Sequence, residues 1–386
     1  MNIRFVAAIA VTAGLQLLAG CGGGGGGIGG TGSMHLSLTD APSCGYDAVN
    51  VSIERVRVHK SSGAVDADSG WSEVVLSPAK RVDLLTLTNG VLEELGQTAL
   101  PAGKYTQMRL VLAPNNGSNP LANSVVPTGG AETALTTPSG QQTGIKVNVD
   151  IDIEADKVAD FVLDFDACKS VVKRGNSGQY NLKPVIAVFP GSDVGLRVVG
   201  YVHPSIAATS TKVSVQSGGV PMKATTPDAT GRFVLYPVRP GNYDLVVSSA
   251  GRVTAVMTGV PVITTAFTNV NSAVVPIAPP IATVRTVTGT VMPATATVRA
   301  LQTFTGGPTV EVAWGPVDAT TGAFDFTLPI EAPVKTAYVV NPLSLGFVAD
   351  VAAAGKYTLE AASNGATRPQ AIDTTAAVPA VTFIFP

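Results

Sequence analysis

The stretch GIKVNVDIDIE, residues 144–154, decides the fold class. Apolar side chains occupy every second position from Ile145 to Ile153, and polar or charged side chains occupy the positions between them. A period of two is that of a β-strand with one buried face and one wet face. The stretch DFVLDFD, residues 160–166, repeats the pattern. Both segments predict strands of a sheet that covers a core.

The pattern continues towards the N-terminus. In AVNVSIERVRVH, residues 48–59, apolar residues alternate in one phase before Glu54-Arg55 and in the opposite phase after it. One extra residue in a strand restores the inward face, so this slip predicts a β-bulge. Residues 91–95 are compatible with one helical turn or two. Residues 115–140 are polar and rich in Pro and Gly, which predicts a long loop.

The composition of the 386 residues agrees with an all-β chain. There are 41 Gly and 27 Pro, and only 13% of the residues are charged, which favours short strands joined by turns over helices. Lys and Arg number 25 against 27 Asp and Glu. Because there is no basic excess to contact phosphates, nucleic acid is not an expected partner.

The first 33 residues are predicted to be a targeting signal and a tether rather than a folded unit. Residues 1–20 have a short basic start and an apolar region too short to span a bilayer, which is typical of a secretory signal peptide. The following Leu18-Ala-Gly-Cys21 resembles the lipobox of bacterial lipoproteins. The resemblance implies cleavage before Cys21, its acylation and, because Gly22 is not Asp, an outer-membrane location. Residues 21–33 are a Gly-rich tether.

The other two cysteines are Cys44 and Cys168. An even pair in an oxidising envelope predicts a disulfide that closes a long loop. Two free buried thiols remain the alternative. Neither residue has His or Cys neighbours at zinc spacing.

Three units are expected behind the tether: residues 34–190, 196–273 and 282–386. A Gly-x-Tyr turn that starts a strand occurs in each of them. Its resemblance to the tyrosine corner of Greek-key sandwiches implies a hydroxyl bonded back to the corner backbone. In the third unit Tyr338 competes with Tyr357 for this place. The turn residues are Gly103, Tyr105, Gly241, Tyr243, Gly355 and Tyr357.

The units resemble known modules. YDAVNVSIERVRVH at 46–59 and LPAGKYTQMRLVL at 100–112, with SLTDAP at 37–42, resemble a domain of unknown function from bacterial envelope lipoproteins (DUF 4382-like). DATGRFVLYPVRPGNYDLVVSSAG at 228–251 is similar to carboxypeptidase regulatory-like, transthyretin-like β-sandwiches, and residues 282–386 to a divergent second copy. These resemblances imply tandem Greek-key, Ig-like or transthyretin-like sandwiches without catalytic chemistry or cofactor.

Candidate catalytic residues are few. The three histidines, His35, His59 and His203, lie at scattered positions, and no nucleophile-elbow or zinc-protease motif occurs. The sequence therefore predicts that the protein is not an enzyme. A cryptic site assembled from distant residues stays open as the least favoured alternative.

Two patterns could bind ligands. Asp150, Asp152 and Glu154 are the calcium candidates, although alternate residues on a strand lie about 6.6 Å apart; a solvated strand face is the alternative. Residues 66–70, DADSG, start like a calcium loop but lack its final Glu, so a hairpin loop is predicted. Trp71 and Trp314 could stack on sugars, or lie in sandwich cores.

These observations predict a non-enzymatic envelope lipoprotein that binds or scaffolds another molecule at the outer membrane. Its expected partners are the membrane, through the lipid anchor, and an envelope protein or glycan. A carbohydrate-binding or adhesive surface lipoprotein is the alternative.

Overall fold

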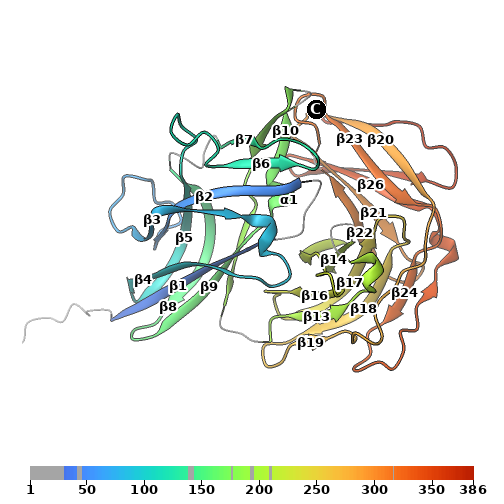
Figure 1. Ribbon diagram of the computed structural model, residues 1–386, viewed down its shortest axis with the longest axis horizontal. Coiled ribbons are helices and arrows are strands. Elements are labelled where there is room, and N and C mark those ends of the chain that lie inside the picture. Colours follow the sequence, from blue (N-terminus) through green and yellow to red (C-terminus); the bar gives the residue numbers. More distant parts are fainter. Residues whose placement is uncertain are drawn as a thin grey trace, which may run out of the picture.

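The computed structural model of the protein describes residues 30–40, 46–137, 143–174, 177–191, 195–207, 211–315 and 317–386. Six sheets form three successive units, each with its own apolar core (Figure 1). The all-β prediction is confirmed. The signal peptide and the tether up to residue 29 lie outside the described residues.

Two sheets enclose the core of the first unit. One has the order β12-β9-β1-β4, and the other has the order β10-β11-β7-β6-β2-β5-β8, with β3 paired to β2. The elements are β1 (Thr31–Asp40), β2 (Tyr46–His59), β3 (Ser72–Asp83), η1 (Leu84–Leu87), β4 (Glu93–Pro101), β5 (Gly103–Leu112), β6 (Ser124–Pro127), β7 (Thr133–Thr136), β8 (Ile145–Ile153), β9 (Val158–Phe165), α1 (Ala167–Ser170), β10 (Val171–Arg174), β11 (Gln179–Leu182) and β12 (Ile186–Pro190).

The strands expected in this unit are present. β8 and β9 cover the two alternating stretches, and the register of β2 against β3 and β5 shifts between Ile53 and Arg55, which confirms the bulge. The helical turn expected at residues 91–95 is wrong: a 3-10 turn forms earlier, at η1, where the Asp83 carboxylate accepts from the Leu85 N–H at 3.1 Å. The loop expected at 115–140 contains the β6–β7 hairpin.

The second unit pairs a sheet of order β16-β13-β19 with one of order β15-β14-β17-β18-β24-β25. The Pro-rich segment 274–282, which precedes the third unit in the chain, packs on the second unit, and the side chain of Ile277 is buried in its core. The elements are β13 (Val198–Tyr201), η3 (Pro204–Ile206), β14 (Thr211–Ser217), β15 (Val220–Thr225), β16 (Arg232–Leu235), β17 (Gly241–Ser249), β18 (Ala255–Val262) and β19 (Thr268–Asn269).

The third unit packs a sheet of order β23-β20-β28 on one of order β22-β21-β26-β27. Two of its strands, β24 and β25, leave it. β24 pairs in parallel with β18 and extends the larger sheet of the second unit. The elements are β20 (Val284–Met292), β21 (Thr297–Thr303), β22 (Thr309–Gly315), β23 (Ala323–Pro329), β24 (Val334–Ala337), β25 (Val348–Ala349), η5 (Val351–Ala353), β26 (Lys356–Ser363), β27 (Ala366–Asp373) and β28 (Val381–Ile384).

Each unit contacts the other two. The Asn89 N–H donates to Thr225 Oγ1 at 2.8 Å, joining the first unit to the second. The side-chain amide of Gln216 exchanges two hydrogen bonds, each 2.7 Å, with the backbone of Glu311, joining the second to the third. The Ala319 N–H donates to the Lys173 carbonyl at 2.9 Å, closing the ring from the third to the first. In Figure 1, α1 lies at the centre of this arrangement.

Candidate functional site

Two of the residues predicted for covalent chemistry fall outside the described part. Cys21 and Cys44 lie in residues that the structure does not describe, so lipidation and the disulfide stay predictions. Cys168 is buried in the short helix α1, whose start is capped by the Asp166 carboxylate accepting from the Lys169 N–H at 3.0 Å.

The three Gly-x-Tyr turns are not equivalent. The Tyr105 hydroxyl donates to the Pro101 carbonyl at 2.9 Å, and that of Tyr243 to the Arg239 carbonyl at 2.8 Å, each four residues back. The Tyr357 hydroxyl instead donates at 2.8 Å to the carbonyl of Pro329, the last residue of β23 in the other sheet of this unit. The third turn therefore differs from the expected corner. Tyr338 makes no such bond; it packs against the core of the second unit.

The glycines of these turns differ as well. Gly103 and Gly355 have φ values of 134° and 63°. Gly241 has no positive φ; a Cβ there would lie 3.1 Å from the Tyr243 hydroxyl. Close approach of the Tyr243 ring, rather than backbone conformation, therefore favours glycine at position 241.

The acidic strand face carries no metal cluster. Asp150 pairs with Lys104 at 2.6 Å, Glu154 pairs with Lys157, and Asp152 is exposed. Among the described residues no three His, Cys, Asp or Glu side chains are placed to hold a metal ion. Nor does any helix in this part of the chain have the length and apolarity needed to cross a membrane.

The three histidines serve separate local contacts. His35 lies between Asp160, 2.8 Å from Nδ1, and Glu94, 3.4 Å from Nε2. The His59 ring lies 5.0 Å from that of Trp71. His203 caps the 3-10 turn η3.

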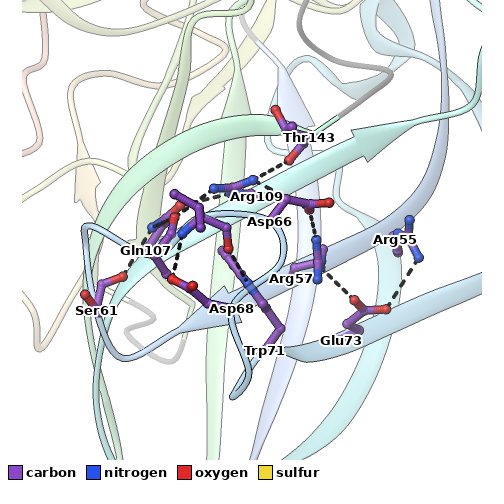
Figure 2. Close-up of polar contacts among 12 residues, drawn as sticks. Arg55, Arg57, Ser61, Asp66, Asp68, Trp71, Glu73, Gln107, Arg109 and Thr143 are labelled. Atoms are coloured by element: carbon purple, nitrogen blue, oxygen red, sulfur yellow. Dashed lines mark hydrogen bonds and ion pairs between the residues drawn. The ribbon is translucent and has the colours of Figure 1, made fainter.

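The loop between β2 and β3 closes over a paired charge cluster, shown in Figure 2. The guanidinium groups of Arg57 and Arg109 lie 4.6 and 4.8 Å from the centroid of the Trp71 ring. Asp66 pairs with both arginines, and Glu73 with Arg57 at 2.7 Å. The predicted hairpin loop is therefore correct, and Trp71 is fixed by cations outside the sandwich core.

A second charged cluster lies where the three units meet. Asp164, near the end of β9, pairs with the buried Lys223 of β15 at 2.6 Å, and its own side chain is 12% exposed. Burial raises the pKa of Asp164, and the Lys223 ammonium opposes this rise. Asp166 pairs with Lys169 at 2.9 Å. The Asp164–Lys223 pair therefore joins the first unit to the second, whereas the Asp166–Lys169 pair lies within the first unit.

The third unit contributes Glu311, on β22. Its carboxylate is buried, and one oxygen lies 3.6 Å from Arg299 while the other has no hydrogen-bond partner within the described part of the chain. Burial raises the pKa of Glu311, and the nearby Lys212, Lys169 and Arg299 oppose the rise.

Lys212, on the outer face of β14, differs from these paired lysines. No hydrogen bond or ion pair links its ammonium to another described residue. Burial lowers its pKa; the charges of Glu311 and Asp166 oppose this, and that of Lys169 adds to it. A lysine in such a position carries a desolvated positive charge without a counter-ion.

Lys212 lines a cavity of about 450 Å³ at this junction. This volume lies in the range of small-molecule sites, which occur preferentially at domain interfaces. A second cation, Arg252, lines it and donates to the Pro279 carbonyl at 3.0 Å. Trp314 contributes an aromatic ring. The other described lining residues are apolar or bear hydroxyl groups: Cys168, Thr211, Thr226, Ser248, Ser249, Ala250, Gly251, Thr254, Val284, Val312, Ala313, Thr327, Leu328 and Pro329.

The cavity wall includes one residue, Cys168, from the region whose family can be recognised. Residues 31–184 match the family model described as domain of unknown function DUF4382. This match confirms the resemblance of the first unit. It does not reach the other two units, and the family's description assigns no activity.

The other comparisons add little. No curated protein matches the chain. Two solved structures, both interface mutants of a type II cohesin–X–dockerin complex from Acetivibrio cellulolyticus, share 24% and 22% identity over 22% and 23% of this chain. The match spans 56% and 59% of those chains, with TM-scores of 0.18 and 0.19, and carries no argument about this protein.

Sequence reasoning missed the junction cavity. Lys212, Arg252 and Trp314 come from separate stretches of the second and third units, and nothing in their spacing indicates that they meet. One signal was available: Lys212, Ser214 and Gln216 form a polar face on a strand whose other face enters the core. That alternation identifies the polar face of β14, but it does not show which part of the chain packs against this face.

Proposed function

We propose that the protein is a non-enzymatic, lipid-anchored binding or scaffolding protein of the outer membrane, and that its ligand enters the junction cavity. The observation that carries this proposal is the cavity itself: all three units contribute to its wall. The contacts between the units, made through Asn89, Gln216 and Ala319, hold the wall in place without a ligand. Such a preformed site loses little conformational freedom on binding.

The proposal that the cavity binds a ligand is tested by identifying small molecules that co-purify with the protein. The full chain is purified from its own membranes, and small molecules released on denaturation are identified by mass spectrometry. Ala313 lines the cavity, so the larger side chain of Ala313→Trp should fill it. The variant should no longer bind a specific ligand, while its melting temperature should stay close to that of the wild type. A wild-type protein with no molecule enriched over the variant would refute the proposal.

The anchor is tested separately. If the acylated Cys21 holds the protein in the envelope, Cys21→Ser should release it from the membrane fraction while secretion continues. A variant that still pellets with membranes would show that lipid is not the attachment.

Carbohydrate binding is the second candidate, and Trp314 favours it. An indole at a cavity wall that also carries Ser248, Ser249 and Thr327 offers a stacking face and hydroxyl partners. A glycan array with the full chain and with Trp314→Ala tests this: binding lost in the variant supports it, and binding equal in both proteins refutes it.

A further inference from the structure

The charge of the junction cavity distinguishes it from other hollows of the molecule. A hollow of about 590 Å³ on the third unit is lined by Lys356 and Asp373, and one of about 580 Å³ by Lys335 and Asp244, so each holds both signs of charge. The described lining of the junction cavity includes Lys212 and Arg252 and no carboxylate. This cavity alone among the three presents unbalanced positive charge.

The unbalanced charge is built into the fold rather than left on a mobile surface. Lys212 sits in the middle of three packed units, where neighbouring lysines already have their own carboxylates: Lys223 has Asp164 and Lys169 has Asp166. The charges of Glu311 and Asp166 act on Lys212, but the ion pairs of these carboxylates are with Arg299 and Lys169. Charges withdrawn from water are normally paired, and no residue that the structure describes supplies such a partner for Lys212.

We propose that the junction cavity binds a small organic anion of about monosaccharide size, with its carboxylate or phosphate on Lys212 and Arg252 and its ring on Trp314. This inference rests on the proposed function and names the class of ligand for that site. The volume of about 450 Å³ admits one sugar ring with its substituent. The hydroxyl groups of Ser248 and Ser249 remain to bond the ligand's own hydroxyls.

The test is isothermal titration calorimetry on the full chain with three probes of similar size: glucuronate, glucose 6-phosphate and neutral glucose. The two anions should bind, and glucose should bind at least about 10-fold more weakly, because a charged hydrogen bond is lost. The preferred anion distinguishes a carboxylate from a phosphate ligand. Equal affinity for all three probes would overturn the proposal.

Variants locate the charge. Lys212→Met should weaken anion binding by about 10- to 100-fold. Lys183→Met is the matched control, because it removes the same charge from an exposed position in the first unit; it should leave binding unchanged. Equal losses in both variants would point to a general charge effect and refute the site. Retained folding is checked by the melting temperature of each variant.

Different results would refute the cavity as a binding site and the anion as its ligand. If the molecule that co-purifies with the protein is neutral, and Lys212→Met retains it while Ala313→Trp loses it, the cavity is a binding site but the anion assignment is wrong. If no probe binds and no molecule co-purifies, both proposals are wrong.

Discussion

The cluster around Trp71 and the cluster around Lys212 contain the same kinds of residue in opposite arrangements. In the first, the cations Arg57 and Arg109 are paired with Asp66 and Glu73 and stack on the indole. In the second, the ammonium of Lys212 forms no hydrogen bond or ion pair within the described part of the chain. A satisfied cluster stabilises the fold, whereas an unsatisfied charge costs stability and is retained where something else uses it.

The largest expected effect comes from opening the satisfied cluster. The buried Arg109 donates to the carbonyls of Ala64 and Thr143, at 2.8 and 2.9 Å, and to the side chain of Gln107 at 2.9 Å. Arg109→Met leaves these acceptors unpaired and should lower the free energy of unfolding by about 3 kcal/mol. Urea unfolding of the full chain measures it. A loss no greater than that of the control Lys183→Met would contradict the account of this cluster.

The two tryptophans provide the next comparison. Trp71 has two cation–π contacts and donates to the Val65 carbonyl at 3.0 Å, whereas Trp314 lines a cavity. Trp71→Ala should therefore cost about 2 kcal/mol more stability than Trp314→Ala. Only Trp314→Ala should reduce ligand binding. Equal stability losses, measured by urea unfolding, would remove the distinction between the clusters.

A smaller effect of opposite sign is expected at Lys212. Because burial holds its pKa below the usual range, its charge opposes folding at neutral pH. Lys212→Met should raise the free energy of unfolding by about 1 kcal/mol. Lys223→Met, which breaks the buried pair with Asp164, should lower it. Thermal unfolding without ligand compares the two variants, and a fall in both would show that Lys212 is structural.

The smallest effect is a pH dependence. The pKa of Lys212 is lowered in the folded protein. Between this lowered pKa and 10.5, the usual lysine value, the unfolded chain therefore binds more protons than the folded chain at the same pH. The free energy of unfolding accordingly increases with pH in this range. The charges around Lys212 are Glu311 on β22, Lys169 on α1 and Asp166, which caps the start of α1. The melting temperature of the wild type relative to Lys212→Met should rise between pH 8 and 10. A constant difference would contradict the lowered pKa.

Side-chain alternation predicted local structure well. It located β8 and β9 and the bulge in β2, because in these strands one face enters the core and the period of two is visible in the sequence. It failed at residues 91–95, where short apolar runs fit a turn or a strand. There, pairing of β4 with β1 decides the conformation.

Contacts between units were not predictable from the same evidence. β24 and β25 come from the third unit's part of the sequence, yet β24 pairs with β18 of the second unit and β25 pairs with β24, and no local pattern distinguishes these partners. The candidate site depends on such packing: Lys212 and Trp314 meet only because β14 and β22 are brought together. Trp71 also departed from expectation, since its partners are two arginines from β2 and β5.

Because β24 and β25 complete a sheet of the second unit, that sheet can be finished only after much of the third unit has been synthesised. A ribosome that has made residues 196–281 has supplied the other strands of the second unit, but the edge of β18 stays bare until residues 334–349 follow. An uncovered edge strand is a template for pairing with another chain. Chains that stop before residue 334 should therefore aggregate more readily than the full chain, because the edge of β18 stays uncovered.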